Sequence, residues 1–396
     1  MKLTKLATLL AVLLFVCTCF VGCGEVVEDN EQTSSKGVTI NVYNWGEYID
    51  PTVNDLFTEE TGIEVNYKNF TDNESMYAVL SSGAATYDIV VPSDYMVGKL
   101  INEGMLAKLN FDNIPNYALI DESMKNQLYD PQNEYSVPYM WGTVGIFYNT
   151  KYVDEADLQQ GWDLLWDEKY AGRIFMFDNP RDAFGIGLLK CGHSLNTTNK
   201  AHWDEAYEQL QAQKPLLHQY VMDQIYDKMI NEEGWIAPYY AGDGIIMMDE
   251  EEGNPAIDFF VPKSGSNLFI DALCIPKNAE HKAEAEQYIN FLCRTDIALL
   301  NAEYIGYSTP HTEARAELDP EIGENENFYP PQEVLDRTEV FMTLPADVST
   351  YMDGLWMKLK LPAAGWAWCT VAVGIAAVAL LIYSFIRYCK KKLRKE

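Results

Sequence analysis

The sequence predicts an α/β fold of about two domains, with a membrane-targeting segment at each end. Between residues 38 and 91, strand-like runs rich in β-branched and aromatic residues alternate with amphipathic helical patterns, which is typical of α/β proteins. The chain has 396 residues, and the part between its two apolar ends is long enough for about two domains.

The first elements are bounded by helix signals. Asp50 is placed as an N-cap, Pro51 takes the first helical position, and Gly62 follows the last periodic residue. The elements expected in this part are strands at 38–43, 63–67 and 87–91 and helices at 51–61 and 75–82.

Further strands and one helix complete the expected body. The strands are expected at 173–177, 245–248, 257–261 and 269–275, and the helix carries an apolar stripe of Ala285, Tyr288, Ile289 and Leu292. The acidic run at 249–252 precedes Gly253 and predicts a solvated turn rather than paired catalytic carboxylates.

The N-terminus predicts a secretion signal of the lipoprotein type. Lys2 and Lys5 precede an apolar run at 6–21, and a small residue stands directly before Cys23. We therefore expect residues 1–22 to be a signal peptide and Cys23 to be the lipidated first residue of the processed chain. Ordinary cleavage without a lipid is the alternative.

The C-terminus predicts a second membrane attachment. Residues 361–386 contain no charged side chain and are long enough to cross a hydrocarbon core of about 30 Å, so we expect a transmembrane helix. The basic tail at 387–396 predicts a cytoplasmic end. The polar segment at 23–36 has no apolar periodicity and predicts a solvated tether. Both ends place the body on the extracytoplasmic side of the cell membrane, in the periplasm or on the outer face.

The charge balance argues against nucleic acid as a partner. The chain has 29 Lys and Arg against 59 Asp and Glu, for a formal net charge of −30. Both ends are basic, so the body is more acidic still. Binding to phosphate backbones requires a basic surface, whereas an acidic surface attracts polycations and also serves solubility.

The cysteines of the body predict neither a disulfide framework nor a zinc site. Cys191, Cys274 and Cys293 are odd in number, form no C-x-x-C pair, and have no histidines nearby at ligand spacing. We expect buried thiols, with one bridge possible, and no metal or cofactor.

Aromatic and acidic side chains gather around the ends of the predicted strands. Trp45, Glu47 and Tyr48 follow the first strand. The other such positions are Ser93, Asp94 and Tyr95 after a strand, residues 178–182 after another, and Tyr239 and Tyr240 before a fourth. Ligands of open α/β sheets lie beyond the carboxyl ends of the strands. Rings attract an organic cation and carboxylates bond an ammonium, although Trp and Tyr also occur commonly as core residues.

Six sequence blocks carry a family resemblance. The chain resembles the substrate-binding proteins of bacterial spermidine/putrescine ABC transporters over residues 37 to about 340. The blocks, in that family's order, are Tyr43-Asn44-Trp45-x-Glu47-Tyr48, Thr61-Gly62-Ile63-x-Val65, Asn73-Glu74-x-Met76-Tyr77-Ala78, Tyr87-Asp88-Ile89-Val90-Val91-Pro92-Ser93, Pro138-Tyr139-x-Trp141-Gly142 and Ile305-Gly306-Tyr307-x-Thr309-Pro310.

The resemblance implies a two-lobed type II periplasmic-binding-protein fold, here with an added C-terminal transmembrane helix. Such proteins capture a solute in the cleft between the lobes and deliver it to an ABC permease without performing chemistry. The division expected is 37–145 plus 268–315 for lobe 1 and 146–267 plus 316–360 for lobe 2.

The resemblance also implies a polyamine site. Glu47, Asp182 and Asp271 would meet ammonium groups, while aromatic rings would flank the methylene chain. The residues matching the family's site are Trp45, Glu47, Tyr48, Ser93, Tyr95, Asn179, Asp182, Tyr240, Phe269, Asp271 and Tyr307.

Four departures from the family pattern leave selectivity open. Asn179 stands where the spermidine binder has an acid, Tyr240 and Phe269 stand at tryptophan positions, and the glutamine expected near Phe341 is missing. The loss of the acid at position 179 favours a ligand with fewer positive charges than spermidine. The three carboxylates that remain, however, match the three charges of spermidine. Putrescine and spermidine are therefore both expected ligands.

Two other functions are compatible with parts of the sequence. The sequence has no nucleotide-binding, zinc-protease or serine-hydrolase motif, so we expect no enzyme; a secreted glycoside hydrolase is the enzymatic alternative, because aromatic platforms with two carboxylates also suit sugars. The nearer alternative is a membrane-tethered receptor or sensor of the same fold for another small solute.

Overall fold

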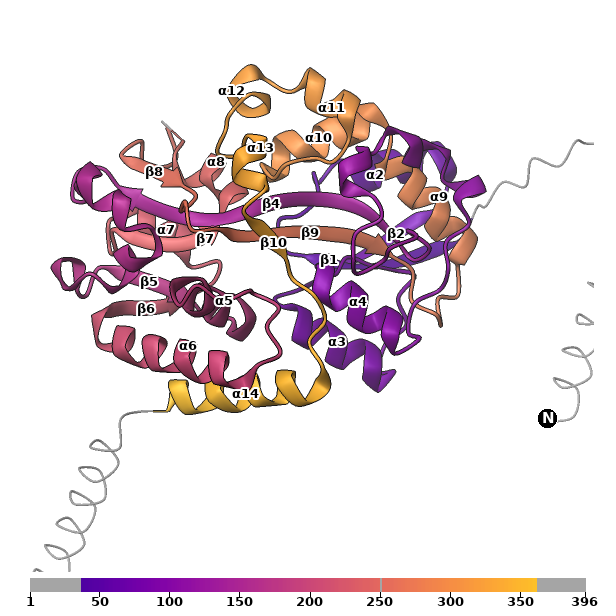
Figure 1. Ribbon diagram of the computed structural model, residues 1–396. Coiled ribbons are helices and arrows are strands. Elements are labelled where there is room, and N and C mark those ends of the chain that lie inside the picture. The colour runs from indigo at the N-terminus through magenta and orange to yellow at the C-terminus, as the bar shows by residue number, and fades with distance from the viewer. Residues whose placement is uncertain (1–36, 250, 362–396) are drawn as a thin grey trace, which may run out of the picture. The chain divides into compact units, whose positions relative to one another are not determined.

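The computed structural model describes residues 37–249 and 251–361, in which strands and helices alternate as the α/β prediction requires (Figure 1). The strands are β1 (Thr39–Trp45), β2 (Glu64–Phe70), β3 (Ile89–Val90), β4 (Ser136–Asn149), β5 (Ile174–Phe177), β6 (Leu217–Val221), β7 (Ile236–Tyr240), β8 (Ile257–Phe260), β9 (Ser266–Cys274) and β10 (Thr338–Val340). The α-helices are α2 (Val53–Thr61), α3 (Asn73–Ser82), α4 (Asp94–Asn102), α5 (Pro180–Lys190), α6 (Lys200–Gln213), α7 (Ile225–Ile230), α8 (Gly244–Met247), α9 (Lys282–Leu292), α10 (Thr295–Ile305), α11 (Thr312–Glu317), α12 (Pro320–Gly323), α13 (Gln332–Leu335) and α14 (Ala346–Lys360).

The first lobe is built on strands β1, β2 and β3, which run parallel, with β9 antiparallel beside β3. Helices cover both faces of this sheet, and each face has its own apolar core. One core includes Phe57 of α2 and Tyr288 of α9, and the other includes Met76 of α3 and Leu100 of α4. Tyr288 belongs to the apolar stripe that the helical periodicity predicted, whereas α4 was not predicted.

Helix α2 begins two residues later than predicted. The Asp50 side chain accepts a hydrogen bond from the Thr52 backbone N–H at 2.8 Å, which forms a turn ahead of the helix, and Val53 is the first helical residue. Asp50 therefore sits before the N-cap position, which Thr52 occupies. The predicted end is confirmed, because Gly62 adopts the left-handed conformation with φ 74°.

Strand β4 joins the two halves of the body. Its residues 136–143 pair antiparallel with β9, whereas Val144–Asn149 pair with β7 and β8. Every residue of β4 is buried. One continuous strand therefore takes part in the pairing of both lobes and connects their cores (Figure 1).

The second lobe is built on β5, β6 and β7. β5 runs parallel to β6 on one side and meets β7 on the other, and β7 is antiparallel to β4. Helices α5 and α6 pack against each other, and their core includes Trp162, Phe175, Phe184 and Trp203.

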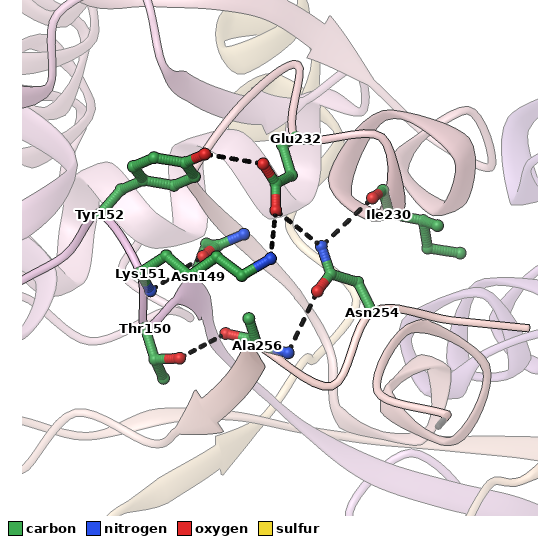
Figure 2. Close-up of polar contacts among 8 residues, drawn as sticks. All are labelled: Asn149, Thr150, Lys151, Tyr152, Ile230, Glu232, Asn254 and Ala256. Carbon is green, nitrogen blue, oxygen red and sulfur yellow. Dashed lines mark hydrogen bonds and ion pairs between the residues drawn. The ribbon is translucent and has the colours of Figure 1, made fainter. Parts of the chain in front are cut away.

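A polar cluster fixes one end of this lobe (Figure 2). Glu232 adopts a positive φ of 59° after α7, and its carboxylate accepts hydrogen bonds from Lys151 Nζ at 2.8 Å and from the Tyr152 hydroxyl at 2.7 Å. Asn254 donates from Nδ2 to the same carboxylate at 3.3 Å and to the Ile230 carbonyl at 3.2 Å. The bond from Lys151 lowers the pKa of Glu232 to about 2. The cluster thus ties the segments after β4 and α7 to the segment before β8.

The C-terminal segment runs from one lobe to the other. Leu318, Phe328 and Tyr329 are buried in the core that contains α3 and α4 of the first lobe. β10 then pairs with β9, and α14 packs on α6 (Figure 1). This packing favours lobe 1 for residues 316–335, which the sequence-based division assigned to lobe 2.

Two predictions around β7 are wrong. Residues 245–248 were expected as a strand, but Gly244–Met247 form helix α8, and Tyr239 and Tyr240 end a strand rather than precede one. A short apolar run such as Ile245–Met248 cannot by itself distinguish a buried strand from a helical turn. Here β7 ends at Tyr240, and the turn Ala241–Asp243 leads directly into α8.

The three cysteines of the body are free thiols, with Cys274 and Cys293 buried and Cys191 half-buried. The single bridge that the sequence left open is therefore absent among them.

The predicted signal peptide, the lipidated Cys23, the tether and the basic tail all lie outside the described residues. So does the predicted transmembrane helix, apart from its first residue, Leu361, which is exposed. Among residues 37–249 and 251–361, no helix combines the length and apolar character needed to cross a bilayer.

Candidate functional site

A cavity of about 300 Å³ lies between the two lobes, and it brings the predicted site residues together. Its walls come from β1, α4, α5, β7, β9 and the segment after α10. All the residues predicted from the resemblance line it: Trp45, Glu47, Tyr48, Ser93, Tyr95, Asn179, Asp182, Tyr240, Phe269, Asp271 and Tyr307.

Asp271 is a buried carboxylate on β9. Its Oδ2 accepts a hydrogen bond from the Tyr48 hydroxyl at 2.6 Å, and its Oδ1 has no partner. Burial raises the pKa of Asp271 to about 6, and the neighbouring hydroxyls of Ser93 and Tyr48 act in the opposite direction. The unpaired oxygen is therefore available to a donor that enters the cavity.

Asp182 lies in the first turn of α5. The Tyr240 hydroxyl donates to its Oδ2 at 3.0 Å, and burial raises the pKa of Asp182 to about 7. The local sequence explains the position of this acid. Asn179 caps the helix by accepting from the Arg181 N–H at 2.9 Å, and Pro180 takes the first helical position. Asn179 therefore lines the cavity, while its side-chain oxygen is engaged in capping the N-terminus of α5.

Asp243 is a further buried acid of the cavity, besides Asp94, Asp182 and Asp271, and the sequence analysis missed it. Asp94 accepts hydrogen bonds from the backbone N–H groups of Tyr95 and Ile270, and burial raises its pKa. Asp243 accepts hydrogen bonds from the hydroxyls of Tyr226 and Tyr307, the latter at 2.7 Å. Burial raises the pKa of Asp243 to about 7. Its place three residues after Tyr240, just beyond the carboxyl end of β7, is the signal that could have identified it.

Glu47 differs from these acids because its side chain is exposed at the cavity rim. It adopts a positive φ of 48° and accepts a hydrogen bond from the Tyr304 hydroxyl at 2.9 Å. The sequence grouped Glu47 with Asp182 and Asp271 as an ammonium ligand, but the structure places Asp243, rather than Glu47, among the buried acids.

Ser93 and Tyr95 are held by neighbours on α3. Asn73 donates to Ser93 Oγ at 3.1 Å, and the Tyr95 hydroxyl donates to Glu74 at 2.9 Å. Burial raises the pKa of Glu74 as well.

Aromatic rings form a nearly continuous wall. Phe269 lies 5.2 Å from Tyr240 and 5.5 Å from Tyr307, and Tyr307 lies 5.4 Å from Tyr48, all as ring-centroid distances with steep interplanar angles. Trp45 packs on a neighbouring phenylalanine, and its Nε1 has no hydrogen-bond partner. Such a wall excludes water and presents π-faces to a cation.

Within the described part of the chain, the cavity lining contains no Lys, Arg or His. Arg181 follows Asn179 and Pro180, but its guanidinium donates to the carbonyls of Leu195 and Met342, at 3.0 and 3.3 Å, and lies 4.1 Å from the Phe341 ring centroid. Arg181 lowers the pKa of Asp182 from a distance, but none of the cavity's buried acids forms an ion pair with a side chain of the described residues. A cationic solute would supply the positive charge to pair with them.

No group of histidine, cysteine and acidic side chains in residues 37–249 and 251–361 is arranged to hold a metal ion. The cavity is thus a binding site built from carboxylates, hydroxyls and rings.

Comparison with known proteins identifies the family. The model of the bacterial extracellular solute-binding proteins matches residues 53–330. This chain is a bacterial extracellular solute-binding protein. It is 36% identical over 323 residues to the spermidine/putrescine-binding periplasmic protein of Escherichia coli K12, which covers 81% of this chain and 91% of the relative. It is 30% identical over 337 residues to the putrescine-binding periplasmic protein SpuD of Pseudomonas aeruginosa, with 81% and 91% covered.

Solved structures confirm the two-lobed fold of this solute-binding protein. The substrate-binding protein PotD of the Streptococcus pneumoniae spermidine/putrescine ABC transporter superposes with a TM-score of 0.72 at 37% identity, covering 82% of this chain and 98% of that one. The TpPotD lipoprotein of Treponema pallidum gives 0.73 at 29% identity, covering 81% and 99%. The family binds solutes outside the cytoplasm and is not a family of enzymes, as the sequence predicted.

Proposed function

We propose that this solute-binding protein captures a linear polyamine, spermidine or putrescine, in the cavity between its lobes and delivers it to an ABC permease. The observation that carries the proposal is that Asp182, Asp243 and Asp271 are buried in the cavity with tyrosine hydroxyls rather than cations as hydrogen-bond partners, and that burial raises their pKa values. The relatives named for spermidine and putrescine support the same ligand class.

The acids and the rings of the cavity contact different parts of the ligand. The buried carboxylates bond the ammonium groups, of which the terminal ones carry three donors each, and the rings of Trp45 and Phe269 flank the methylene chain. Glu47 attracts the ligand at the rim. The remaining residues of the proposed ligand site are Tyr48, Ser93, Tyr95, Asn179, Tyr240 and Tyr307.

The two lobes are proposed to close on the ligand by bending at β4. The division is the one predicted from the sequence, 37–145 plus 268–315 and 146–267 plus 316–360, with residues 316–335 transferred to lobe 1. The burial of Leu318, Phe328 and Tyr329 in the first lobe's core supports that transfer.

We further propose that the protein is anchored to the membrane on its extracytoplasmic side. The sequence features that support this are the lipoprotein-type signal at 1–22 with Cys23, the apolar run at 361–386 and the basic tail at 387–396. The Treponema pallidum relative is itself described as a lipoprotein.

Titration calorimetry tests the proposed function. The detergent-purified protein is titrated with spermidine, with putrescine and with butane-1,4-diol, an uncharged molecule of putrescine's length. We expect an affinity near micromolar, about −8 kcal/mol, for at least one polyamine and no heat with the diol. Absence of heat with both polyamines would reject the ligand class.

A further inference from the structure

Three residues of β9 line the cavity in a row. Asn267, Phe269 and Asp271 are spaced two apart on one strand, so their side chains project from the same face. Phe269 contributes a ring to the wall and Asp271 contributes a carboxylate, as described above. Asn267 is not among the residues matched to the family's site.

The Asn267 amide presents an unpaired oxygen. The residue is 4% exposed, and its Nδ2 donates to the backbone carbonyls of Leu268 at 3.2 Å and of Glu339 at 3.0 Å. Its Oδ1 has no hydrogen-bond partner. The amide cannot be rotated to relieve this, because the oxygen would then face those two carbonyls. A buried acceptor without a donor is costly, so a donor from the ligand would stabilise it.

Neighbouring charged groups do not supply that donor. Glu339 stands beside Asn267 in the register of β10 and β9, and its carboxylate accepts from Ser194 at 2.5 Å and from Asn196 Nδ2 at 3.5 Å. Arg181 of α5 bonds the Met342 carbonyl just after β10, and its guanidinium is otherwise engaged with the Leu195 carbonyl and with Asn196. Asp182, Asp243 and Asp271 are acceptors like the Asn267 oxygen.

The spacing of the two unpaired acceptors selects for ligand length. Four residues along a strand, from Asn267 to Asp271, span roughly 13 Å. An extended putrescine separates its nitrogens by roughly 6 Å and an extended spermidine its terminal nitrogens by roughly 11 Å, given single bonds of about 1.5 Å. A hydrogen bond of about 2.9 Å at each end adds roughly 6 Å to the reach of either ligand. A diamine bonded to Asp271 then spans roughly 12 Å and falls short of Asn267, whereas a triamine spans up to roughly 17 Å and reaches both.

We propose that Asn267 is the far end of the ligand site, accepting a hydrogen bond from the terminal ammonium of a spermidine-length triamine whose other end meets Asp271. This rests on the proposed function and specifies its substrate: the site favours a triamine over a diamine. An ammonium has three donors, so it can bond the amide oxygen together with other acceptors of the cavity.

Replacement of the amide oxygen tests the assignment. Calorimetry on the purified protein compares the wild type with Asn267→Leu, which keeps the size and removes the acceptor, and with Asn267→Asp, which adds a charge. We expect Asn267→Leu to weaken spermidine about tenfold or more and putrescine less than about twofold, since a hydrogen bond to a charged group is lost only for the triamine. Asn267→Asp should strengthen spermidine more than putrescine.

The control is Asn149→Leu, because Asn149 is a buried asparagine with an unpaired Nδ2 that lies outside the cavity lining. It should leave the spermidine-to-putrescine ratio unchanged. If Asn267→Leu does not fold, Asn267→Asp decides the question through the same ratio. An unchanged ratio in the folded Asn267 variants would overturn the inference while the proposed function stands. Failure of the wild type to bind either polyamine would reject the proposed function itself.

Discussion

At the residue scale, the site depends on carboxylates that are buried beside tyrosine hydroxyls rather than beside cations. A hydroxyl donor stabilises a carboxylate without cancelling its charge, so the pKa values of Asp182, Asp243 and Asp271 stay above the ordinary value. The bound ligand then supplies the missing positive charge. Arg181 does not, because its guanidinium is committed to carbonyls and to Phe341.

Asp271→Asn is expected to weaken polyamine binding by about 2–5 kcal/mol, because it removes one member of a buried charged pair. The matched control is Asp258→Asn. Asp258 accepts from the Tyr148 hydroxyl at 2.8 Å, as Asp271 accepts from Tyr48, but it lies outside the cavity lining. Calorimetry measures both. Equal affinities for the Asp271 variant and the wild type would remove Asp271 from the site.

Asp243→Asn is expected to weaken binding by a similar amount, about 2–5 kcal/mol, whereas Glu47→Gln should cost less than about 1 kcal/mol. The reason is burial: Asp243 is buried against two tyrosine hydroxyls, and Glu47 is solvent-exposed. Dissociation constants of the two variants at one ionic strength check the order. A larger loss for Glu47→Gln would contradict it.

The acids also predict how pH affects the ligand. A carboxyl whose pKa is raised on folding is protonated in the free site below about pH 6–7, and a protonated acid cannot pair with an ammonium. These acids therefore make the free protein progressively less stable as pH rises from near their ordinary pKa of 3.8 to about 7, and a bound polyamine offsets that loss. The ligand-induced rise in Tm should be larger at pH 8 than at pH 5. A rise that is larger at pH 5 would show that the acids are not the ligand's partners.

The sequence could predict those site residues that lie at positions matched to the family's binding site. The predicted residues all line one cavity because the family resemblance extends over residues 37 to about 340, including the positions between the six blocks. Asp243 and Asn267 were not among the positions matched to the family's site. The exposure of Glu47 depends on a local backbone turn with φ 48°, which a residue type does not reveal. Asn267 could have been found from its two-residue spacing with Phe269 and Asp271.

At the element scale, the ends of strands and the starts of helices place the site. β1, β7 and β9 each carry aromatic or acidic residues to the cavity, and α5 brings Asp182 there in its first turn. Most predicted elements are confirmed to within a few residues because their boundaries have physical markers such as Gly62. The strand predicted at 245–248 is wrong because a four-residue apolar run is too short to show a periodicity. The turn before it leads the chain into a helix instead.

The turn between β7 and α8 gives a prediction at this scale. A Cβ on Gly242 would lie 2.6 Å from Tyr307 Cε1, well inside van der Waals contact. Gly242→Ala should displace Tyr307, lowering the free energy of unfolding by about 1–3 kcal/mol and weakening polyamine binding. Gly354→Ala, where nothing lies within 4 Å, is the control and should leave stability unchanged or raised by up to about 1 kcal/mol. Urea unfolding measures both; a Gly242 variant as stable as wild type would contradict the close packing.

At the scale of the whole molecule, two lobes share β4 and are linked again by β10 and the segment that leads to α14. Contacts with a ligand in the cavity can therefore stabilise an arrangement in which the lobes lie close together. The chain's overall acidity raises the local concentration of a polycation. The sequence predicted two lobes, and the buried contacts of Leu318, Phe328 and Tyr329 favour placing 316–335 with lobe 1. A core partner that is distant in sequence leaves no local pattern from which this could be predicted.

Ligand binding should stabilise the whole protein by mass action. At a spermidine concentration one hundred times the dissociation constant, we expect about 2.7 kcal/mol of added stability, together with a rise in Tm that grows with ligand concentration. Thermal unfolding with increasing spermidine measures this. The Asp271→Asn protein at the same concentrations serves as the control and should respond less. A Tm independent of spermidine in the wild type would contradict capture.

The most direct test of the buried acids as the ligand's counterions is the number of protons released on binding. Spermidine is titrated into the protein near pH 6.5 in buffers with different heats of ionisation, which separates proton transfer from the heat of binding. Ammonium groups placed beside Asp182, Asp243 and Asp271 lower their pKa values, so a net release of protons is predicted. Binding without proton release, or with proton uptake, would contradict the account.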